Sequence, residues 1–413
     1  MNRGERYRLT IERPAAGGRM IARHEGAIVF VSGAIPGEVV EAEVEKVQRG
    51  TAWAGTRAVV ERSPDRIDAP EGACGGSVFA HIAYDRQRTL KSQIIDDAFR
   101  RIGRLSLESP TVVVASPVDG YRMRARLHVR HGKIGFFREG SHNLCDAAST
   151  RQLRDDSIAI LRTLEHALPG EHLVAEIELS ENIDATARAC HFELPPGAEG
   201  SRLRSLGEVA GVTGATCAVA GDPRTTDLWG SPYVSDTIAG ALLSRHARSF
   251  FQGNRFLTGG LTEHVLAQLE AAPILDLYAG VGLFSVSAAA HGRGSVVAVE
   301  GDPSSAADLK RNAGGHDVRV REEPVEEYLD RVKDRPNTVI VDPPRTGMSK
   351  EAVAGVMRLK APRLVYVSCD VATLARDARV LVDAGYRLLS IRAFDLFPNT
   401  AHVETVVSFA AGE

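Results

Sequence analysis

Three segments in the last quarter of the chain carry side chains that can act as nucleophile and base. One apolar stretch ends in Asp342, another ends in Cys369, and Glu404 lies inside the apolar run 401–409. A thiolate is a strong nucleophile, a carboxylate accepts protons, and burying a glutamate without a partner is unfavourable. Cys369 and Glu404 are therefore candidate catalytic residues. The alternative for Cys369 is a small apolar filler, the usual role of a single buried cysteine.

Local backbone restraints predict where these side chains point. Pro343 and Pro344 force an extended backbone just past the strand that ends in Asp342. This is the edge of a parallel sheet where ligands bind, so Asp342 is expected to face the crevice. His402 and Glu404 are two residues apart, a spacing that predicts one shared strand face.

A glycine turn upstream is the candidate cofactor site. Residues 274–285 read as a strand, a turn containing Gly280 and Gly282, and the start of a helix, whose N–H groups can meet a ligand. The dinucleotide-binding form would require a third glycine where the chain has Ser285. Glu300 ends the next strand and can accept both hydroxyls of an adenosine ribose. The combination favours S-adenosylmethionine over NAD, with a plain strand–helix turn as the alternative.

From about residue 260 onward, apolar strands alternate with amphipathic helices. This alternation predicts βαβ units in a parallel, doubly wound sheet, so the fold class is α/β with a Rossmann-like domain at 246–413. The expected elements are Ile274–Tyr278, Leu283–Ala290, Val296–Glu300, Ser304–Asn312, Thr338–Asp342, Leu364–Ser368 and Thr373–Ala384.

Two smaller units are expected before this domain. Short alternating strands predict a small β-barrel at 1–62, with a β-hairpin decoration of the main domain as the alternative. A turn-rich junction follows at 63–72, and residues 63–245 are expected to form a central α+β domain. Within it, residues 84–102 predict a helix that packs on the C-terminal domain. The apolar stripe of this helix is Leu90, Ile94, Ile95, Ala98, Phe99 and Ile102.

A basic strand is expected at Tyr121–Arg130, where apolar residues alternate with Arg122, Arg124, Arg126, His128 and Arg130. Period-two alternation predicts one buried face, which leaves the arginines on the other. A row of guanidinium groups suits contacts with the phosphates of RNA. The alternative is a solvated strand face balanced by carboxylates on a neighbouring strand.

Composition sets broader limits. The 413 residues carry a net charge of −3, which excludes a wholly basic nucleic-acid coat but not a local basic surface. No run of 18 apolar residues and no signal peptide are found, so we expect no membrane association and a cytoplasmic location. The cysteines are odd in number and scattered, which indicates reduced thiols. They are Cys74, Cys145, Cys190, Cys217 and Cys369.

These motifs together resemble the RNA 5-methyluridine methyltransferase family, which modifies uracil C5 in tRNA and large-subunit ribosomal RNA. The resemblance covers nearly the whole chain, and residues 26–38 are similar to a TRAM domain. The matching segments are Phe250–Asn254, Asp276–Gly282, Asp342–Gly347, Ser368–Asp370 and His402–Glu404.

The resemblance implies a class I methyltransferase domain, an OB-like TRAM barrel and a role for each matching residue. Cys369 would be the nucleophile and Glu404 the base, while Arg345 would order its loop or stabilise charge on the base. The thiolate would add to uracil C6, C5 would take the methyl group, and Glu404 would remove the C5 proton. S-adenosylmethionine would be bound by Gln252, Tyr278, Gly280, Glu300 and Asp342.

The sequence also departs from this family. Many relatives carry cysteines for a [4Fe–4S] cluster in the pattern Cys-x5-Cys-Gly-Gly-Cys plus a distant cysteine. Asp68, Ser77 and Thr150 stand at these positions here, and only Cys74 remains, with Cys145 offset by five residues.

We therefore expect no iron–sulfur cluster and no metal site. Two further changes are Met123 and Arg124 in the segment that commonly reads Tyr-Arg-Asn-Lys, and Ala279 in place of a cysteine. A monomer that acts on tRNA or 23S rRNA is expected. The other hypotheses are a methyltransferase with a different substrate and a non-catalytic RNA-binding protein.

Overall fold

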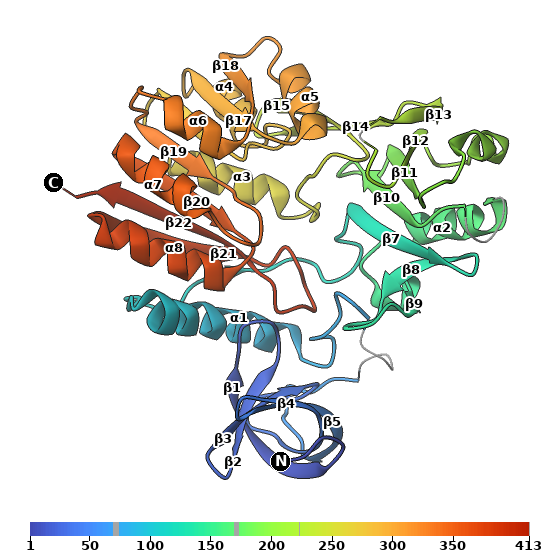
Figure 1. Ribbon diagram of the computed structural model, residues 1–413, viewed down its shortest axis with the longest axis vertical. Helices are drawn as coiled ribbons and strands as arrows, with labels where there is room; N and C mark the ends of the chain where they lie inside the picture. The colour runs from blue at the N-terminus through green and yellow to red at the C-terminus, as the bar shows by residue number, and fades with distance from the viewer. Residues whose placement is uncertain (69–73, 169–172, 223, 413) are drawn as a thin grey trace.

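The computed structural model describes residues 1–68, 74–168, 173–222 and 224–412, and these form three bodies (Figure 1). In the view of Figure 1, the N-terminal body lies at the bottom, the C-terminal body at the upper left and the central body at the right. Of the junction expected at 63–72, residues 69–72 lie outside the described part. Within the described ranges, no helix is long and apolar enough to cross a membrane.

The N-terminal body is a closed barrel with the strand order β1-β2-β3-β5-β4. Alternate residues such as Leu9, Ile11, Val29 and Val31 point inward and are almost completely buried. The barrel prediction is therefore confirmed over the hairpin alternative. The strands are β1 (Arg6–Pro14), β2 (Met20–His24), β3 (Ala27–Ser32), β4 (Val39–Gln48) and β5 (Thr51–Glu61).

The C-terminal body is built on a mixed sheet with the order β18-β17-β16-β19-β20-β22-β21-β6. The strands from β18 to β20 run parallel, as predicted, but β22 is antiparallel to both β20 and β21. A short loop joins β21 to β22, and a parallel pair would need a long crossover instead. The strands are β16 (Ile274–Leu277), β17 (Val296–Glu300), β18 (Val318–Glu322), β19 (Thr338–Val341), β20 (Arg363–Ser368), β21 (Tyr386–Phe394), β22 (Glu404–Ala411) and β6 (Val113–Val114).

Helices cover both faces of this sheet, because its strands are apolar on both sides. Val339 and Val341 pack in one core with α6, α7 and α8, whereas Ile340 packs in the other with α3, α4 and α5. The expected α/β, Rossmann-like fold is thus confirmed. The helices are α3 (Thr258–Ala267), α4 (Ser285–Ala290), α5 (Pro303–Asn312), α6 (Val325–Arg331), α7 (Lys350–Leu359) and α8 (Val371–Asp383).

Segments that precede the central body in sequence also join the C-terminal sheet. The predicted helix forms α1 (Tyr84–Ala98) and continues as a π-helical turn, η1 (Phe99–Gly103), against α8. Strand β6 then pairs with β21 at the sheet edge. Ile102 is an exception to the predicted stripe, since the change to π-helix leaves it 45% exposed. Figure 1 shows α1 between the barrel and α8.

The central body is a sheet with the order β13-β12-β11-β10-β7-β8-β9, which packs against α2. Ala125, Leu127 and Val129 of β7 are buried, so the predicted alternation is confirmed. A separate hairpin, β14 (Tyr233–Ile238) and β15 (Ala241–His246), packs against α5. The elements are β7 (Arg124–Arg130), β8 (Lys133–Phe137), β9 (Leu144–Asp146), η2 (Ala148–Thr150), α2 (Asp155–Ala167), β10 (Glu176–Glu181), β11 (Arg188–Leu194), η3 (Gly200–Leu206), β12 (Gly214–Val219) and β13 (Thr226–Gly230).

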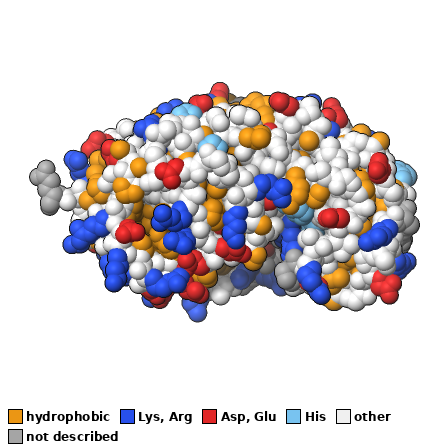
Figure 2. Space-filling model, turned by 90° about the horizontal axis from the view of Figure 1, so that it is seen from above, with side chains coloured by type: hydrophobic (Ala, Val, Ile, Leu, Met, Phe, Trp, Pro, Cys, Tyr) orange, Lys and Arg blue, Asp and Glu red, His pale blue; other side chains and the backbone are white. Residues whose placement is uncertain are grey.

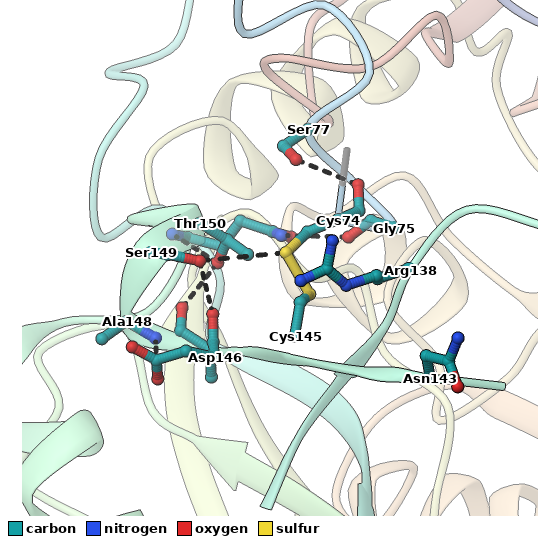
Figure 3. The surroundings of a disulfide bond; sticks show 12 residues. Cys74, Gly75, Ser77, Arg138, Asn143, Cys145, Asp146, Ala148, Ser149 and Thr150 are labelled. Carbon is teal, nitrogen blue, oxygen red and sulfur yellow. Dashed lines mark hydrogen bonds between the residues drawn. A yellow bond between two sulfur atoms is a disulfide. The ribbon is translucent and has the colours of Figure 1, made fainter. Parts of the chain in front are cut away.

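Cys74 and Cys145 form a disulfide (Figure 3). Their Cα atoms are 5.9 Å apart, because β9 pairs with β8 while a bridge pairs Cys74 with Arg138 just beyond β8. The expectation of reduced thiols is therefore wrong for this pair. The pairing of the strands brings Cys145 next to Cys74. The position of Cys145 in the sequence, five residues before Thr150, did not indicate this contact.

Charged side chains of both signs are interspersed over the face of the molecule seen in Figure 2. This agrees with a net charge of −3 and with the many arginine–carboxylate pairs of the structure. Any basic surface for a polyanion is therefore local.

Candidate active site

A cavity of about 720 Å³ opens where β16, β17, β19 and β20 end. It lies between the C-terminal sheet and the basic strand β7, as expected for a ligand site at the carboxyl edge of a parallel sheet. The cavity is lined by every site residue predicted from the sequence: Arg122, Arg124, Arg126, Gln252, Tyr278, Gly280, Glu300, Asp342, Arg345, Cys369 and Glu404.

Cys369 and Glu404 come from neighbouring antiparallel strands. Ser368 at the end of β20 pairs with Thr405 on β22. One further step in this register places Cys369 opposite Glu404, and side chains of opposed residues project from the same face. The predicted pairing of His402 with Glu404 on one strand face is wrong, because β22 begins at Glu404 and His402 lies exposed before it.

The turn around Cys369 is held by its two neighbours. The Asp370 side chain caps α8 by accepting hydrogen bonds from the N–H groups of Ala372 (3.0 Å) and Thr373 (2.9 Å). The Asp370 N–H donates to Ser368 Oγ at 3.1 Å. The thiol is thereby fixed between the end of a buried strand and the start of a helix.

Burial and neighbouring carboxylates raise the pKa of both the thiol and the glutamate in the ligand-free protein. Burial raises the pKa of Cys369 to about 12, and Glu404 raises it further, while the Arg345 guanidinium acts in the opposite direction. Burial also raises the pKa of Glu404 well above its usual value, as does Asp342. Arg345 is thus the cation that favours the ionised forms of both residues.

Two aspartates lie close together at this edge of the sheet: Asp342 lines the cavity, and Asp276 is completely buried nearby. Burial raises the pKa of Asp342 to about 7, and the nearby Asp276 carboxylate adds to this shift. Gln252 Nε2 donates to Asp342 Oδ2 at 3.4 Å. Asp276 Oδ2 accepts from the N–H of Ser285, but Asp276 Oδ1 has no hydrogen-bond partner among the described residues. Burial raises the pKa of Asp276 to about 7 as well.

The glycine turn presents open backbone to the cavity. Gly280 has φ +57°, and a Cβ atom there would meet nothing within 4 Å in the described chain. The N–H groups of Gly280 (2.7 Å) and Asp302 (2.6 Å) donate to separate oxygens of Glu300. Gly282 has φ +97°, and a Cβ atom there would lie 2.6 Å from Val286. Glycine is therefore required at 282 for packing, whereas Gly280 leaves space for a ligand.

Sequence reasoning missed Asp377, which holds the loop that follows Asp342. Asp377 Oδ2 accepts hydrogen bonds from Met348 N–H (3.1 Å) and Tyr366 O–H (2.8 Å). A Cβ atom at Gly347 would approach Asp377 to 2.8 Å, so the glycine of this motif allows a close contact between the loop and α8. The buried position of Asp377 within an apolar helix stripe is the signal that could have identified it.

The basic strand lies at the rim of the cavity, but carboxylates balance part of its charge. Glu178 on β10 pairs with Arg124 (2.8 Å) and Arg126 (2.7 Å). The Arg124 side chain is mostly buried, whereas that of Arg126 remains 59% exposed. The Arg122 guanidinium lies over the ring of Phe136. A neighbouring strand thus carries a balancing carboxylate, as the alternative of a solvated strand face requires. All three arginines nevertheless line the cavity.

Comparisons with known proteins agree with this site. Family models match a TRAM domain at residues 1–54 and a tRNA (uracil-5-)-methyltransferase at 327–411. A 23S rRNA (uracil(1939)-C(5))-methyltransferase of Pseudomonas entomophila is 34% identical over 99% of this chain and 94% of its own length. The Pseudomonas putida protein of that name is 33% identical with the same coverage. The chain belongs to the RNA uracil-C5 methyltransferase family. It is an S-adenosylmethionine-dependent RNA (uracil-5-)-methyltransferase with a TRAM domain.

A solved structure shares the fold of this methyltransferase over almost its full length. The tRNA (uracil-54, C5)-methyltransferase of Pyrococcus abyssi, in complex with S-adenosyl-L-homocysteine, superposes with a TM-score of 0.78. It is 24% identical, and the match covers 97% of this chain and 99% of that chain.

The cavity residues of this methyltransferase fit its cofactor. S-adenosylmethionine carries an ammonium group, a positively charged sulfonium and a ribose diol. Asp342 is a carboxylate that lines the cavity, and the nearby Asp276 Oδ1 is a buried acceptor with no partner among the described residues. Gly280 leaves open space next to Glu300. Cationic groups can satisfy the aspartates, and hydroxyl groups can donate to Glu300.

Proposed function

We propose that this protein methylates uracil C5 through a covalent bond between Cys369 Sγ and uracil C6. The observation that carries the proposal is the placement of Cys369 opposite Glu404 in one cavity, which the Asp342 carboxylate also lines. A nucleophile, a base and a site for a cationic cofactor are thus within reach of a single pyrimidine ring.

The chemistry needs both residues because uracil C5 is a poor nucleophile. Addition of the Cys369 thiolate to C6 forms the S–C6 bond and moves an electron pair to the C4 oxygen, so that C5 becomes nucleophilic. S-adenosylmethionine supplies the methyl group that C5 accepts. Glu404 then takes the C5 proton, the C5–C6 double bond re-forms, and the thiolate leaves. This elimination breaks the S–C6 bond and returns Cys369 to its starting state.

Arg345 is proposed to favour the two charged forms that this reaction uses. It lies on the loop after Asp342 and lowers the pKa of both Cys369 and Glu404. Because Arg345 is exposed in the ligand-free protein, its guanidinium is free to meet the incoming base as well.

The cofactor is proposed to bind along the edge formed by β16, β17 and β19. Glu300 is held by two backbone N–H groups and keeps lone pairs for the ribose hydroxyls. Asp342 and Gln252, which hydrogen-bond each other, meet the cationic end. Tyr278, at φ +61°, and Gly280 form the turn over which the cofactor lies.

We propose large-subunit ribosomal RNA as the substrate. The two Pseudomonas relatives that match nearly the full chain at 33–34% identity are named for 23S rRNA. The name of the Pyrococcus abyssi protein specifies a tRNA, and that match lies at 24% identity. In either RNA the target uridine must leave its stack to reach Cys369 inside the cavity.

The test is to trap the adduct with RNA that contains 5-fluorouracil. Fluorine at C5 cannot leave as a proton, so the methylated ring stays bonded to Cys369. We expect a denaturant-stable protein–RNA band with a 23S rRNA fragment and S-adenosylmethionine, and no band for Cys369→Ala. Cys190→Ala, which changes a buried thiol outside the cavity, is the matched control and should form the band normally. A wild-type protein that methylates RNA without forming the adduct would overturn the mechanism.

A further inference from the structure

The loop between β21 and β22 forms one wall of the catalytic cavity. Leu396 and Phe397 of this loop line the cavity, and the loop leads into Glu404 at the first position of β22. Phe394, the last residue of β21, pairs with Glu404 across the hairpin. The conformation of residues 395–403 therefore bears directly on where Phe397 and Glu404 lie.

This loop is held by a lysine that lies about 300 residues away in the sequence, on α1. Lys91 Nζ lies 2.5 Å from Asp395 Oδ1 and donates a hydrogen bond to the Phe397 carbonyl oxygen at 3.0 Å. The side chains of Lys91 and Asp395 are both completely buried, with 0% exposed. Figure 1 shows α1 running below α8 and the β21–β22 hairpin.

Two further side chains hold the same loop. Gln87, one turn earlier on α1, donates to Asn399 Oδ1 and accepts from the Asn399 N–H, each at 2.9 Å. Asn254 Nδ2 donates to the Leu396 carbonyl oxygen at 3.1 Å. The loop is thus fixed at residue 395, at each of the next two residues, and again at Asn399.

Stability alone gives a poor account of a completely buried ion pair. Removing two charges from water is unfavourable, and well-packed apolar side chains of similar volume commonly stabilise a fold as well or better. What the ammonium group of Lys91 adds is geometry, because it ties the Asp395 side chain to the Phe397 carbonyl oxygen two residues further on. An apolar residue could fill the space without fixing this turn.

We propose that Lys91 is a positioning residue for methyl transfer. Through Asp395 and the Phe397 carbonyl, it sets the cavity wall that carries Phe397 and the start of the strand that carries Glu404. The inference rests on the proposed function in one respect, the assignment of Glu404 as the base. Lys91 itself does not line the cavity described above.

The test removes both charges together, so that neither is left buried and unpaired. The double variant Lys91→Met/Asp395→Asn is compared with wild type on total RNA from cells that lack the gene. Displacing the base by a fraction of an ångström should lower kcat by on the order of tenfold to a hundredfold. Affinity for S-adenosylhomocysteine should stay within about twofold, since the cofactor residues lie on other strands. The fraction of RNA in a denaturant-stable adduct should rise, because addition proceeds while proton removal slows.

Matched variants separate positioning from simple loss of stability. Leu90→Ala changes the neighbouring residue of α1, which packs against the barrel core, and should lower Tm without changing kcat or the adduct fraction. Gln87→Leu removes the contacts to Asn399 but leaves the ion pair between Lys91 and Asp395. It should give a smaller fall in kcat than the double variant. This variant also tests the inference if the double variant does not fold. A double variant with wild-type kcat would overturn the inference. So would a fall in kcat that Leu90→Ala reproduces at a similarly lowered Tm.

Glu404→Gln is measured in parallel to keep the two proposals apart. If Glu404→Gln turns over normally, the proposed base is wrong and the inference falls with it. If Glu404→Gln stalls while the Lys91 double variant behaves as wild type, only the inference fails.

Discussion

Arg126 faces Glu178 across the β7–β10 pair at 2.7 Å, and the same glutamate holds Arg124. One carboxylate therefore restrains two of the arginines at the cavity rim. Because Arg126 is the more exposed of the two, it is the better placed to exchange this partner for an RNA phosphate.

Replacing Arg126 with Ala should weaken RNA binding and reduce its salt dependence. Loss of one phosphate contact should lower the slope of log K against log salt by about 0.7 for single-stranded RNA and about 0.9 for a duplex. Glu178→Gln should act in the opposite sense, since it frees both guanidinium groups. Filter binding at several salt concentrations measures both effects, with Arg331→Ala on α6 as an exposed control. An unchanged slope in Arg126→Ala would mean that Arg126 makes no phosphate contact and that this face of β7 is a solvated surface balanced by carboxylates.

Glu404→Gln should allow thiolate addition and methylation but stop proton removal. The amide cannot accept the C5 proton, so methylated RNA should accumulate as a covalent adduct with Cys369. A denaturing gel with labelled RNA, followed by mass spectrometry of the adduct, measures this directly. Glu300→Gln is the control, because it should weaken cofactor binding without accumulating any adduct. Rapid turnover by Glu404→Gln with free 5-methyluridine RNA as product would remove the base assignment.

The raised pKa of Asp342 predicts that the ligand-free protein loses stability as pH rises. Asp342 has a folded-state pKa of about 7 against an ordinary value of 3.8. Between these values the unfolded chain has released the proton that the folded protein keeps, so the unfolded state binds fewer protons. The contribution to the free energy of unfolding should then fall by about 1.4 kcal/mol per pH unit, and the loss is complete above pH 7.

Asp342→Asn should remove this penalty. Relative to wild type, the variant should have an unchanged Tm near pH 4 and a higher Tm at pH 8, measured by thermal unfolding without cofactor. Asp184→Asn, a substitution at an exposed aspartate, should show no such trend. A Tm difference that is the same at both pH values would mean that Asp342 is already ionised in the folded protein.

Four predicted site residues converge because each one follows, or begins, a strand of the C-terminal sheet, and these are Tyr278, Asp342, Cys369 and Glu404. Tyr278, Asp342 and Cys369 come directly after or one residue beyond apolar runs, and parallel strands bring such positions to one edge. The alternation of apolar strands and helices in the sequence was therefore enough to predict that these motifs lie at one edge of the sheet. The β21–β22 hairpin departed from the parallel pattern, yet it brought Glu404 to the same edge from the opposite direction.

What the sequence could not show depends on register between distant segments. Glu178 meets Arg126 across 52 residues, and Lys91 meets Asp395 across 304. Neither pair has a local signal, since Lys91, Arg126 and Glu178 are ordinary charged residues of helices or strands and Asp395 is a charged loop residue. Only the packed fold distinguishes these residues from solvated charges. Packing excludes water from a charged side chain and places a partner of opposite charge beside it.

The disulfide between Cys74 and Cys145 should stabilise the oxidised protein. It closes a loop with a sequence separation of 71 residues, and restricting the unfolded chain over that length contributes about 4 kcal/mol in the chain-entropy model. Dithiothreitol should therefore lower Tm in wild type but not in Cys74→Ser/Cys145→Ser. Alkylation of the unfolded chain should label three cysteines before reduction and five afterwards, as the sequence and the free thiols require.

The same bond predicts the metal content of the purified protein. Iron–sulfur clusters are held by cysteine thiolates, usually four, and Asp68, Ser77 and Thr150 offer harder oxygen ligands instead. Cys74 and Cys145 engage each other, and Cys190 and Cys217 are buried in the core of the central sheet. Protein purified without oxygen should therefore contain no stoichiometric iron or sulfide, and reduction of the disulfide should not create an iron site. Finding about four irons per chain would mean that other side chains complete a cluster, and that the disulfide forms only after the cluster is lost.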